Sequence, residues 1–159
     1  MKIIPLTQGK VTQVSDQDYE YFNQWKWHTL KIRNTFYAVR NDGSYPSQRK
    51  ILLHREIINA PDRTQVDHIN GDGLFNIREN LRTCTNTENQ RNRGKHKNNV
   101  SGFKGVRPLR GNNDKYEAYI YHEKKQIYLG KFISIDDAAN AYDEAAKKYH
   151  GKFARLNFG

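Results

Sequence analysis

The sequence predicts an α+β protein built from two small units that are joined by a basic linker. A length of 159 residues allows one ordinary domain or two small ones. A Gly-containing basic run at 91–99 interrupts the chain, and two alternating strands and one amphipathic helix follow it. Short strand-like and helix-like pieces precede it. We therefore expect an N-terminal unit at 1–93, a linker at 94–100 and a C-terminal unit at 101–159.

In the N-terminal unit, apolar patterning predicts strands at 3–6, 10–14, 27–32 and 36–40, with a turn at 41–44. Ser15 with Asp18 three residues later predicts the start of a helix. The apolar segment 50–58 closes before Pro61. We expect the first fifty residues to pack on, or extend, the segment that follows them.

The C-terminal unit shows a clearer pattern. Ala118 and Ile120 alternate with polar and tyrosine residues over 116–121, and a turn at 122–125 leads to a second alternating strand, 126–132. Ser134 predicts a helix start, and an apolar stripe at spacings of three and four continues to a stop at Gly151. We therefore expect a small antiparallel sheet, three-stranded with the strand before it, that packs on one helix.

The composition narrows the function classes. Lys and Arg number 27 against 17 Asp and Glu, which gives a net charge of +10, and both 1–100 and 101–159 are net positive. We expect nucleic acid as the partner, with an anionic membrane surface second. No apolar run approaches the roughly 18 residues of a membrane span, and the first residues are too short for a secretory signal. The single Cys84 excludes an internal disulfide and a multi-Cys zinc site.

The linker region carries the densest positive charge. We expect its basic side chains to follow a nucleic-acid backbone, while a solvated charge run without a partner stays the alternative. These side chains are Arg91, Arg93, Lys95 and Lys97.

One segment of the N-terminal unit brings reactive side chains together. A strand ends in Asp67-His68 and enters a loop rich in Gly and Asn, after which a short strand begins at Leu81. Thr85-x-x-Glu88 is a capping box, so a helix should begin at Asn86 and carry Asn89 in its first turn or so. This strand–loop–strand–helix pattern is predicted to gather Asp67, His68, Asn80 and Asn89.

That pattern resembles the HNH endonuclease family over roughly residues 50–93. The resemblance implies the ββα-metal fold, with His68 as general base, Asn80 orienting the loop, and Asp67 and Asn89 as metal ligands. Many relatives have His at the last position, where this chain has Asn. No Cys pairs surround the motif, so we expect no structural zinc.

The chemistry of these residue types fits phosphodiester hydrolysis. A neutral imidazole can take a proton from water near neutral pH. A carboxylate and an amide oxygen suit a hard divalent cation, Mg²⁺ or Mn²⁺. Arg78 and Arg82 are candidate phosphate contacts or simply surface charge, and His54 is a candidate phosphate contact or a buried packing residue.

Other polar residues of the loop have a simpler interpretation. Asn and Asp tolerate left-handed backbone, which favours Asn70, Asp72 and Asn76 as turn formers.

Residues 101–159 resemble the AP2 DNA-binding domain. The matching segments are Gly105-Val106-Arg107, Ala118-Tyr119-Ile120, Leu129-Gly130-Lys131-Phe132, Ala138 to Asp143, His150-Gly151 and Leu156-Asn157-Phe158. The resemblance implies that the exposed sheet face lies in the DNA major groove. The implied contact positions are Lys104, Arg107, Arg110, Tyr119, Tyr121, Gln126 and Tyr128.

This chain departs from the AP2 pattern on that face. Tyr128 stands where Trp is common, and Tyr119 and Tyr121 replace a Glu and an Arg of plant members, so the usual GC-rich preference is not expected. A tyrosine stripe that packs on the nuclease unit is the alternative.

Together the two resemblances imply a site-selective, metal-dependent DNA endonuclease of the nicking or homing kind, which leaves 5′-phosphate and 3′-hydroxyl ends. The partner is double-stranded DNA, and monomer and homodimer stay open. The expected setting is the cytoplasm of a bacterial host, with the gene on a phage or mobile element. A DNA-binding regulator with an idle nuclease fold is the alternative, and an RNA-binding protein is a weaker third.

Overall fold

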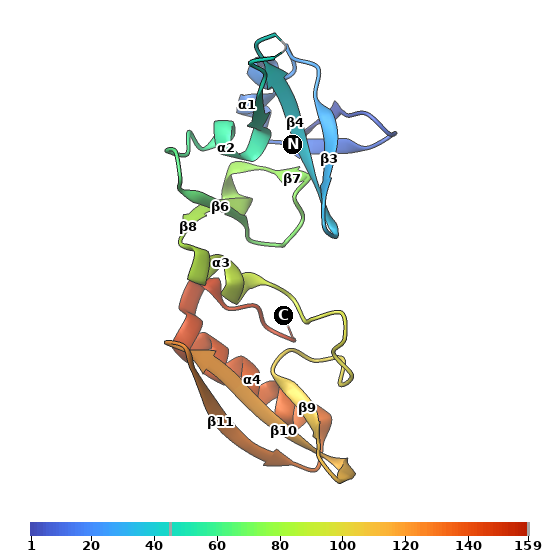
Figure 1. The fold of residues 1–159 in the computed structure, drawn as a ribbon, viewed down its shortest axis with the longest axis vertical. Coiled ribbons are helices and arrows are strands. Elements are labelled where there is room, and N and C mark those ends of the chain that lie inside the picture. Colours follow the sequence, from blue (N-terminus) through green and yellow to red (C-terminus); the bar gives the residue numbers. More distant parts are fainter. Residues whose placement is uncertain (45, 159) are drawn as a thin grey trace. The chain divides into compact units, whose positions relative to one another are not determined.

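A computed structural model describes residues 1–44 and 46–158, apart from the side chain of Asn113. The chain divides into two compact units, Met1–Asn89 and Gln90–Gly159. The described part contains small, mostly antiparallel sheets and four α-helices (Figure 1). The α+β prediction is therefore confirmed. Among the described residues, no helix is both long and apolar enough to cross a membrane.

The first unit contains three small sheets, which are β1-β2-β7, β3-β4-β5 and the β6-β8 pair. Strand β2 pairs antiparallel with β1 and parallel with β7. The elements are β1 (Lys2–Pro5), β2 (Val11–Val14), α1 (Asp16–Phe22), β3 (His28–Ile32), β4 (Thr35–Asp42), β5 (Arg49–Leu52), α2 (Leu53–Ile57), β6 (Gln65–His68), β7 (Phe75–Asn76), the 3₁₀ turn η1 (Arg78–Asn80), β8 (Leu81–Cys84) and α3 (Asn86–Asn92), the last of which continues into the second unit.

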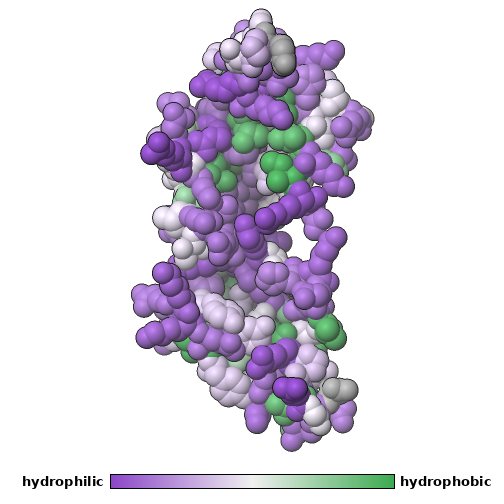
Figure 2. Space-filling view, viewed as in Figure 1, coloured by the Kyte–Doolittle hydropathy of each residue, from purple (hydrophilic) through white to green (hydrophobic). Residues whose placement is uncertain are grey.

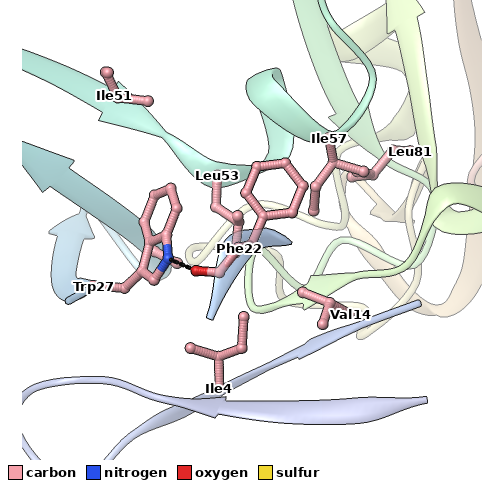
Figure 3. Close-up of a cluster of buried hydrophobic side chains, with 9 residues drawn as sticks. Ile4, Val14, Phe22, Trp27, Ile51, Leu53, Ile57 and Leu81 are labelled. Atoms are coloured by element: carbon pink, nitrogen blue, oxygen red, sulfur yellow. Dashed lines mark hydrogen bonds between the residues drawn. The ribbon is translucent and has the colours of Figure 1, made fainter. Parts of the chain in front are cut away.

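The core of the first unit draws side chains from both ends of its sequence (Figure 3). Ile4 of β1 and Val14 of β2 are buried together with Leu81 of β8. The indole of Trp27 also lies in this core, and its Nε1 donates to the Phe22 carbonyl oxygen at 2.8 Å. Full burial of an aliphatic side chain such as that of Ile4 contributes about 1.5–3 kcal/mol to the stability of the fold. The N-terminal residues therefore belong to the core that supports β6 and β8.

The two helix starts predicted for this unit differ in how they are capped. At α3 the capping box is confirmed, because Glu88 Oε2 accepts from Thr85 N at 2.8 Å and Glu88 N donates to Thr85 Oγ1 at 3.2 Å. At α1 the helix begins where expected, but Ser15 makes no side-chain cap bond. Its Oγ accepts instead from Arg78 N, and Asp18 binds the Arg78 guanidinium. A long-range ion pair has replaced the local cap.

The second unit is a three-stranded antiparallel sheet, ordered β11-β10-β9, packed on one long helix. Its elements are β9 (Val106–Leu109), β10 (Asn112–His122), β11 (Lys125–Phe132), α4 (Ile135–His150) and the 3₁₀ turn η2 (Gly151–Phe153). Ala118 and Ile120 of β10 are buried against Ala138 and Tyr142 of α4. The predicted alternation and helix stripe are thus confirmed.

Both ends of α4 follow local chemistry. Ser134 Oγ accepts from the backbone N–H groups of Asp136 and Asp137, as an N-cap residue does. Gly151 ends the helix with a φ of +53°, a conformation that glycine adopts without strain. The C-terminal tail is tied back to the helix, because buried Asp143 accepts from Asn157 N at 2.8 Å.

Candidate active site and candidate nucleic-acid interface

Strand β6 presents Asp67 and His68 at its C-terminal end. It pairs antiparallel with β8, so that Asp67 lies opposite Arg82 and His68 lies opposite Leu81. Only 5% of Asp67 and 6% of His68 is exposed. The backbone pairing of β6 with β8, rather than a loop, therefore fixes the positions of the buried carboxylate and the buried imidazole.

The loop between β6 and β8 is closed by Asn80. Its Oδ1 accepts from Asn70 N at 3.0 Å, and its Nδ2 donates to the carbonyl oxygen of Phe75 at 2.7 Å. Two turns form within this loop, because Asn70 Oδ1 accepts from Asp72 N and Asp72 Oδ1 accepts from Leu74 N. Asn70 and Asp72 are thus the predicted turn formers, and Asn80 fixes the loop that follows His68.

Asn76 is not the turn former that the sequence predicted. It lies in β7 with none of its surface exposed, and its Oδ1 is 2.9 Å from His68 Nε2. Its Nδ2 donates to Thr12 Oγ1 at 2.7 Å. Sequence reasoning missed this residue because its second partner lies 64 positions away on β2. The site therefore includes a fifth polar residue that holds the imidazole.

Burial controls the charge of His68. Removal from water lowers its pKa below the usual 6.5, while the hydrogen bond with Asn76 and the charge of Asp67 act in the opposite direction. The imidazole is consequently neutral at neutral pH. A neutral imidazole has one nitrogen that can accept a proton.

A second histidine packs against the first. The ring of His54, on α2, lies with its centroid 5.0 Å from that of His68, and Tyr37 of β4 contacts both rings. Burial and the nearby His68 lower the pKa of His54 to about 3. His54 Nδ1 has no hydrogen-bond partner among the described residues. The structure therefore brings His54 to the site as a neutral side chain behind His68, and a phosphate contact for it stays a prediction.

Both arginines that were candidates for a phosphate contact or for surface charge bind carboxylates. Arg82 Nη2 lies 2.7 Å from Asp67 Oδ2, with 14% of the arginine side chain exposed. Arg78 binds Asp18 of α1 through Nη2 at 2.7 Å and Nε at 2.9 Å. Arg78 thus joins α1 to the turn before β8, and Arg82 neutralises Asp67.

Helix α3 delivers Asn89 to the face of β6 that carries Asp67. Asn89 Nδ2 donates to Gln65 Oε1 at 2.9 Å. Gln65 and Asp67 are two residues apart on one strand and so share a face. A carboxylate and an amide oxygen on that face fit a hard cation such as Mg²⁺, which keeps several waters when protein supplies few ligands. No group of three or more His, Cys, Asp or Glu side chains suited to a metal occurs in the described part of the chain.

Around the linker the basic side chains are accessible. Arg93, Lys95 and Lys97 are exposed, and Arg91 is partly buried. Lys95 Nζ donates to the Gly102 carbonyl oxygen at 2.7 Å. The visible face of the molecule is mainly hydrophilic (Figure 2). These side chains can therefore reach an anionic partner from solvent.

The outer face of the C-terminal sheet carries exposed tyrosines. Tyr121 of β10 is 58% exposed and Tyr128 of β11 is 52% exposed. Tyr121 Oη donates to Gln126 Oε1 at 3.0 Å, and Tyr119 lies opposite Tyr128 in the ladder. The ring of Tyr119 also contacts that of Tyr121 edge to face. Four of the predicted contact positions therefore form one continuous surface, named here the tyrosine face: Tyr119, Tyr121, Gln126 and Tyr128.

The predicted basic contacts of this unit lie in three settings. Arg107 of β9 borders the tyrosine face, with its guanidinium 5.3 Å from the Tyr119 ring, and it pairs with Glu117 at 3.0 Å. Arg110 is exposed just after β9. Lys104 precedes that strand, and its Nζ donates to the carbonyl oxygens of Arg91 and Arg93. Burial lowers the pKa of Lys104 to about 8. Its ammonium is thus used to bind backbone carbonyls at the end of α3.

Comparison with known proteins finds a relative that matches over most of the chain. No protein-family model matches this chain. The chain is 31% identical over 158 residues to an uncharacterised HNH endonuclease of Acanthamoeba polyphaga mimivirus, and the match covers 94% of this chain and 75% of the relative.

Shorter matches join part of the chain to plant proteins. Dehydration-responsive element-binding protein 2A of Arabidopsis thaliana is 38% identical over 66 residues, which is 42% of this chain and 20% of that protein. An AP2/ERF and B3 domain-containing protein of Oryza sativa subsp. japonica is 41% identical over 58 residues, which is 36% of this chain and 15% of that protein. These plant proteins are therefore similar to this chain over a fifth or less of their own length.

Proposed function

The chain belongs to the HNH endonuclease family, and we propose that it is a divalent-metal-dependent, site-selective DNA endonuclease with His68 as its general base. The buried Asp67-His68 pair at the end of β6 carries this proposal. Helix α3 adds Asn89 on the same side of β6 as Asp67, and Asn80 closes the loop after His68. The viral source of the relative supports a gene of viral or mobile-element origin.

The proposed reaction is hydrolysis of a phosphodiester. His68, neutral because it is buried, accepts a proton from water as the water oxygen attacks phosphorus. The bond from phosphorus to the 3′ oxygen breaks and the departing oxygen takes a proton from solvent, which leaves a 3′-hydroxyl and a 5′-phosphate. Asp67 and Asn89 would hold Mg²⁺ or Mn²⁺, which would stabilise charge on the phosphate and on the leaving oxygen. One such site per chain nicks one strand, so a double-strand break needs a second chain or a second nick.

The C-terminal unit is proposed to select the DNA site. Its tyrosine face is exposed, bordered by Arg107 and followed by Arg110, and a sheet face of this size can enter a major groove. The linker side chains would neutralise phosphates of the DNA backbone; these side chains are Arg93, Lys95 and Lys97. Partial matches to a plant dehydration-responsive element-binding protein and to a plant AP2/ERF and B3 domain-containing protein support a DNA-binding segment in this chain.

Relaxation of a supercoiled plasmid tests the nuclease proposal. Wild-type protein should nick the plasmid with Mg²⁺ or Mn²⁺ and should stop when EDTA is added. His68→Ala should reduce the nicking rate by about 10²–10⁴-fold, the usual contribution of a general base. His28→Ala, which changes a histidine of β3, is the matched control and should nick at the wild-type rate.

The same assay separates the alternative functions. A wild-type protein that binds duplex DNA yet nicks with neither metal would be a DNA-binding regulator, and the nuclease proposal would be wrong. Competition between duplex DNA and duplex RNA of one sequence tests the partner. Equal affinity for both would contradict binding through the major groove, because the RNA major groove is too deep and narrow for a sheet.

A further inference from the structure

A chain of buried hydrogen bonds connects the N-terminal hairpin to His68. Thr12 Oγ1, on β2, donates to the Leu74 carbonyl oxygen at 2.8 Å. Asn76 Nδ2 donates to Thr12 Oγ1 at 2.7 Å, and Asn76 Oδ1 lies 2.9 Å from His68 Nε2. Neither Thr12 nor Asn76 has any exposed surface. Water therefore does not compete for these bonds.

The direction of each bond in this chain follows from the one before it. A carbonyl oxygen can only accept, so the Thr12 hydroxyl uses its single proton to donate to the Leu74 carbonyl oxygen. The Thr12 oxygen then accepts, which requires the NH₂ group of Asn76 on that side. A second acceptor, the Gly73 carbonyl oxygen at 3.3 Å from Asn76 Nδ2, favours the same orientation. The Asn76 oxygen consequently faces His68, and His68 Nε2 must be the nitrogen that donates.

The backbone pairing of β2 with β7 aligns the residues of this hydrogen-bond series. Strands β2 and β7 pair in parallel, with Gln13 opposite Phe75 and Val14 opposite Asn76. Gln13 N also donates to the Leu74 carbonyl oxygen at 2.9 Å. The bond from Thr12 thus joins a carbonyl that the sheet already holds in place. A slip of the hairpin by one residue would move Thr12 to the opposite face of the strand.

We propose that Thr12 is a positioning residue that acts through Asn76 to keep His68 as its Nε2–H tautomer, which leaves Nδ1 as the nitrogen that accepts the proton from water. This inference rests on the proposed nuclease function only for its effect on rate. It gives the first fourteen residues a chemical role in addition to their place in the core. The hydroxyl of Thr12, rather than its size, is the feature that matters.

Three variants separate the hydroxyl from packing. Thr12→Val keeps the shape and removes the hydroxyl, whereas Thr12→Ser keeps the hydroxyl. Thr29→Val is the matched control, because Thr29 Oγ1 donates to the Thr7 carbonyl oxygen at 2.7 Å in the same unit. Leu74 retains the bond from Gln13 N in every variant, so no backbone carbonyl is left without a donor.

The first measurement is the ¹⁵N spectrum of the His68 ring in full-length protein, without DNA and at one pH where the ring is neutral. Wild type should show a protonated, pyrrole-type Nε2 and an unprotonated, pyridine-type Nδ1. In Thr12→Val the Asn76 amide loses its nearer acceptor, so the Nε2–H fraction should fall. Thr12→Ser and Thr29→Val should keep the wild-type spectrum.

The second measurement is the nicking rate at saturating DNA with Mg²⁺. Thr12→Val should lower kcat by about 10–100-fold, as loss of a partner that orients a catalytic ligand does, and should leave KM unchanged. Thr12→Ser should restore kcat to within about twofold of wild type. The combined change in spectrum and kcat distinguishes positioning from a general loss of stability, which Thr29→Val would share.

The two proposals fail in different ways. A wild-type spectrum with the proton on Nδ1, or a folded Thr12→Val with the wild-type tautomer ratio, overturns the role of Thr12, and the wild-type spectrum decides this even if Thr12→Val does not fold. Absence of nicking together with the expected spectra supports the hydrogen-bond chain and contradicts the nuclease function.

Discussion

The guanidinium of Arg82 binds the carboxylate of Asp67, with Nη2 2.7 Å and Nε 2.9 Å from Oδ2. The two residues face each other across the β6–β8 ladder, and 14% and 6% of their side chains are exposed. A buried carboxylate without a counter-charge costs several kcal/mol. Arg82 therefore supplies the positive neighbour that this buried side chain needs, and the proposed cation would add a second one.

Replacing Arg82 should make the fold depend on a divalent cation. In EDTA, Arg82→Met should lower the free energy of unfolding by about 3–5 kcal/mol, because Asp67 stays buried without its partner. Mg²⁺ should then raise the Tm of the variant more than that of wild type. Thermal unfolding with and without Mg²⁺ measures both effects.

Arg78→Met is the matched control for this experiment. It also breaks an ion pair, with Asp18, but 43% of its side chain is exposed and its partner is not a proposed metal ligand. Its Tm should respond to Mg²⁺ as wild type does. An equal response of Arg82→Met and Arg78→Met would contradict a cation at Asp67.

His54 should make the first unit sensitive to acid. Its pKa is about 3 in the fold against 6.5 when unfolded, so the unfolded chain binds a proton between these values while the fold does not. Its contribution to stability is therefore complete above pH 6.5 and is lost as pH falls toward 3, at about 1.4 kcal/mol per pH unit. His54→Phe should reduce that slope in urea unfolding between pH 4 and 6.5.

Exposed His96 provides the control for the pH slope. His96→Phe should leave the dependence of unfolding free energy on pH as in wild type. A His54→Phe slope equal to that of wild type would show that another group is responsible for acid unfolding.

The features that the sequence predicted correctly are encoded over short distances. The capping box of Thr85 and Glu88 acts within one helical turn, and the alternation around Ala118 and Ile120 reflects the two faces of one strand. Local chemistry of this kind does not depend on what the rest of the chain does. The starts of α3 and α4 therefore followed from the residues alone.

The features that it missed depend on partners far along the chain. Asp18 binds Arg78 across 60 residues, which removed the capping box expected at Ser15. Asn76 was predicted as a turn former because nothing near it in sequence shows that it meets Thr12 and His68. Tertiary contacts determine the partners of such side chains, and a single sequence does not show which residues meet in the fold.

Gly105 should be indispensable for the second unit. A Cβ there would lie 2.0 Å from the Tyr142 ring and 2.7 Å from the Tyr119 carbonyl oxygen, and φ is +74°. Gly102 has a similar φ of +82° but no atom within 4 Å of its added Cβ. Gly102→Ala should cost about 1 kcal/mol for backbone strain alone.

Gly105→Ala should cost about 1–3 kcal/mol more than Gly102→Ala, because it adds overpacking to the same strain. Urea unfolding of the two variants gives the difference directly. If the two losses are equal, the close approach of β9 to α4 at Tyr142 does not limit the packing of this unit.

The tyrosine face and the linker should contribute to DNA binding in physically different ways. Tyr121→Ala removes a side chain proposed to contact bases, so affinity for the selected site should fall by about 1–3 kcal/mol with little change in its salt dependence. Lys97→Ala removes a proposed phosphate contact, so it should weaken binding to any sequence and reduce the slope of log K against log salt by about 1.

Tyr21 gives the matched control, since it is also 58% exposed but lies on α1. Tyr21→Ala should leave both affinity and salt slope as in wild type, when binding is measured at several salt concentrations. A loss of affinity in Tyr121→Ala that is the same for every DNA sequence would place its ring on the backbone, because only contacts with base edges distinguish one sequence from another. A loss restricted to the selected site would identify the sheet as the surface that reads sequence, and the linker as the surface that supplies charge.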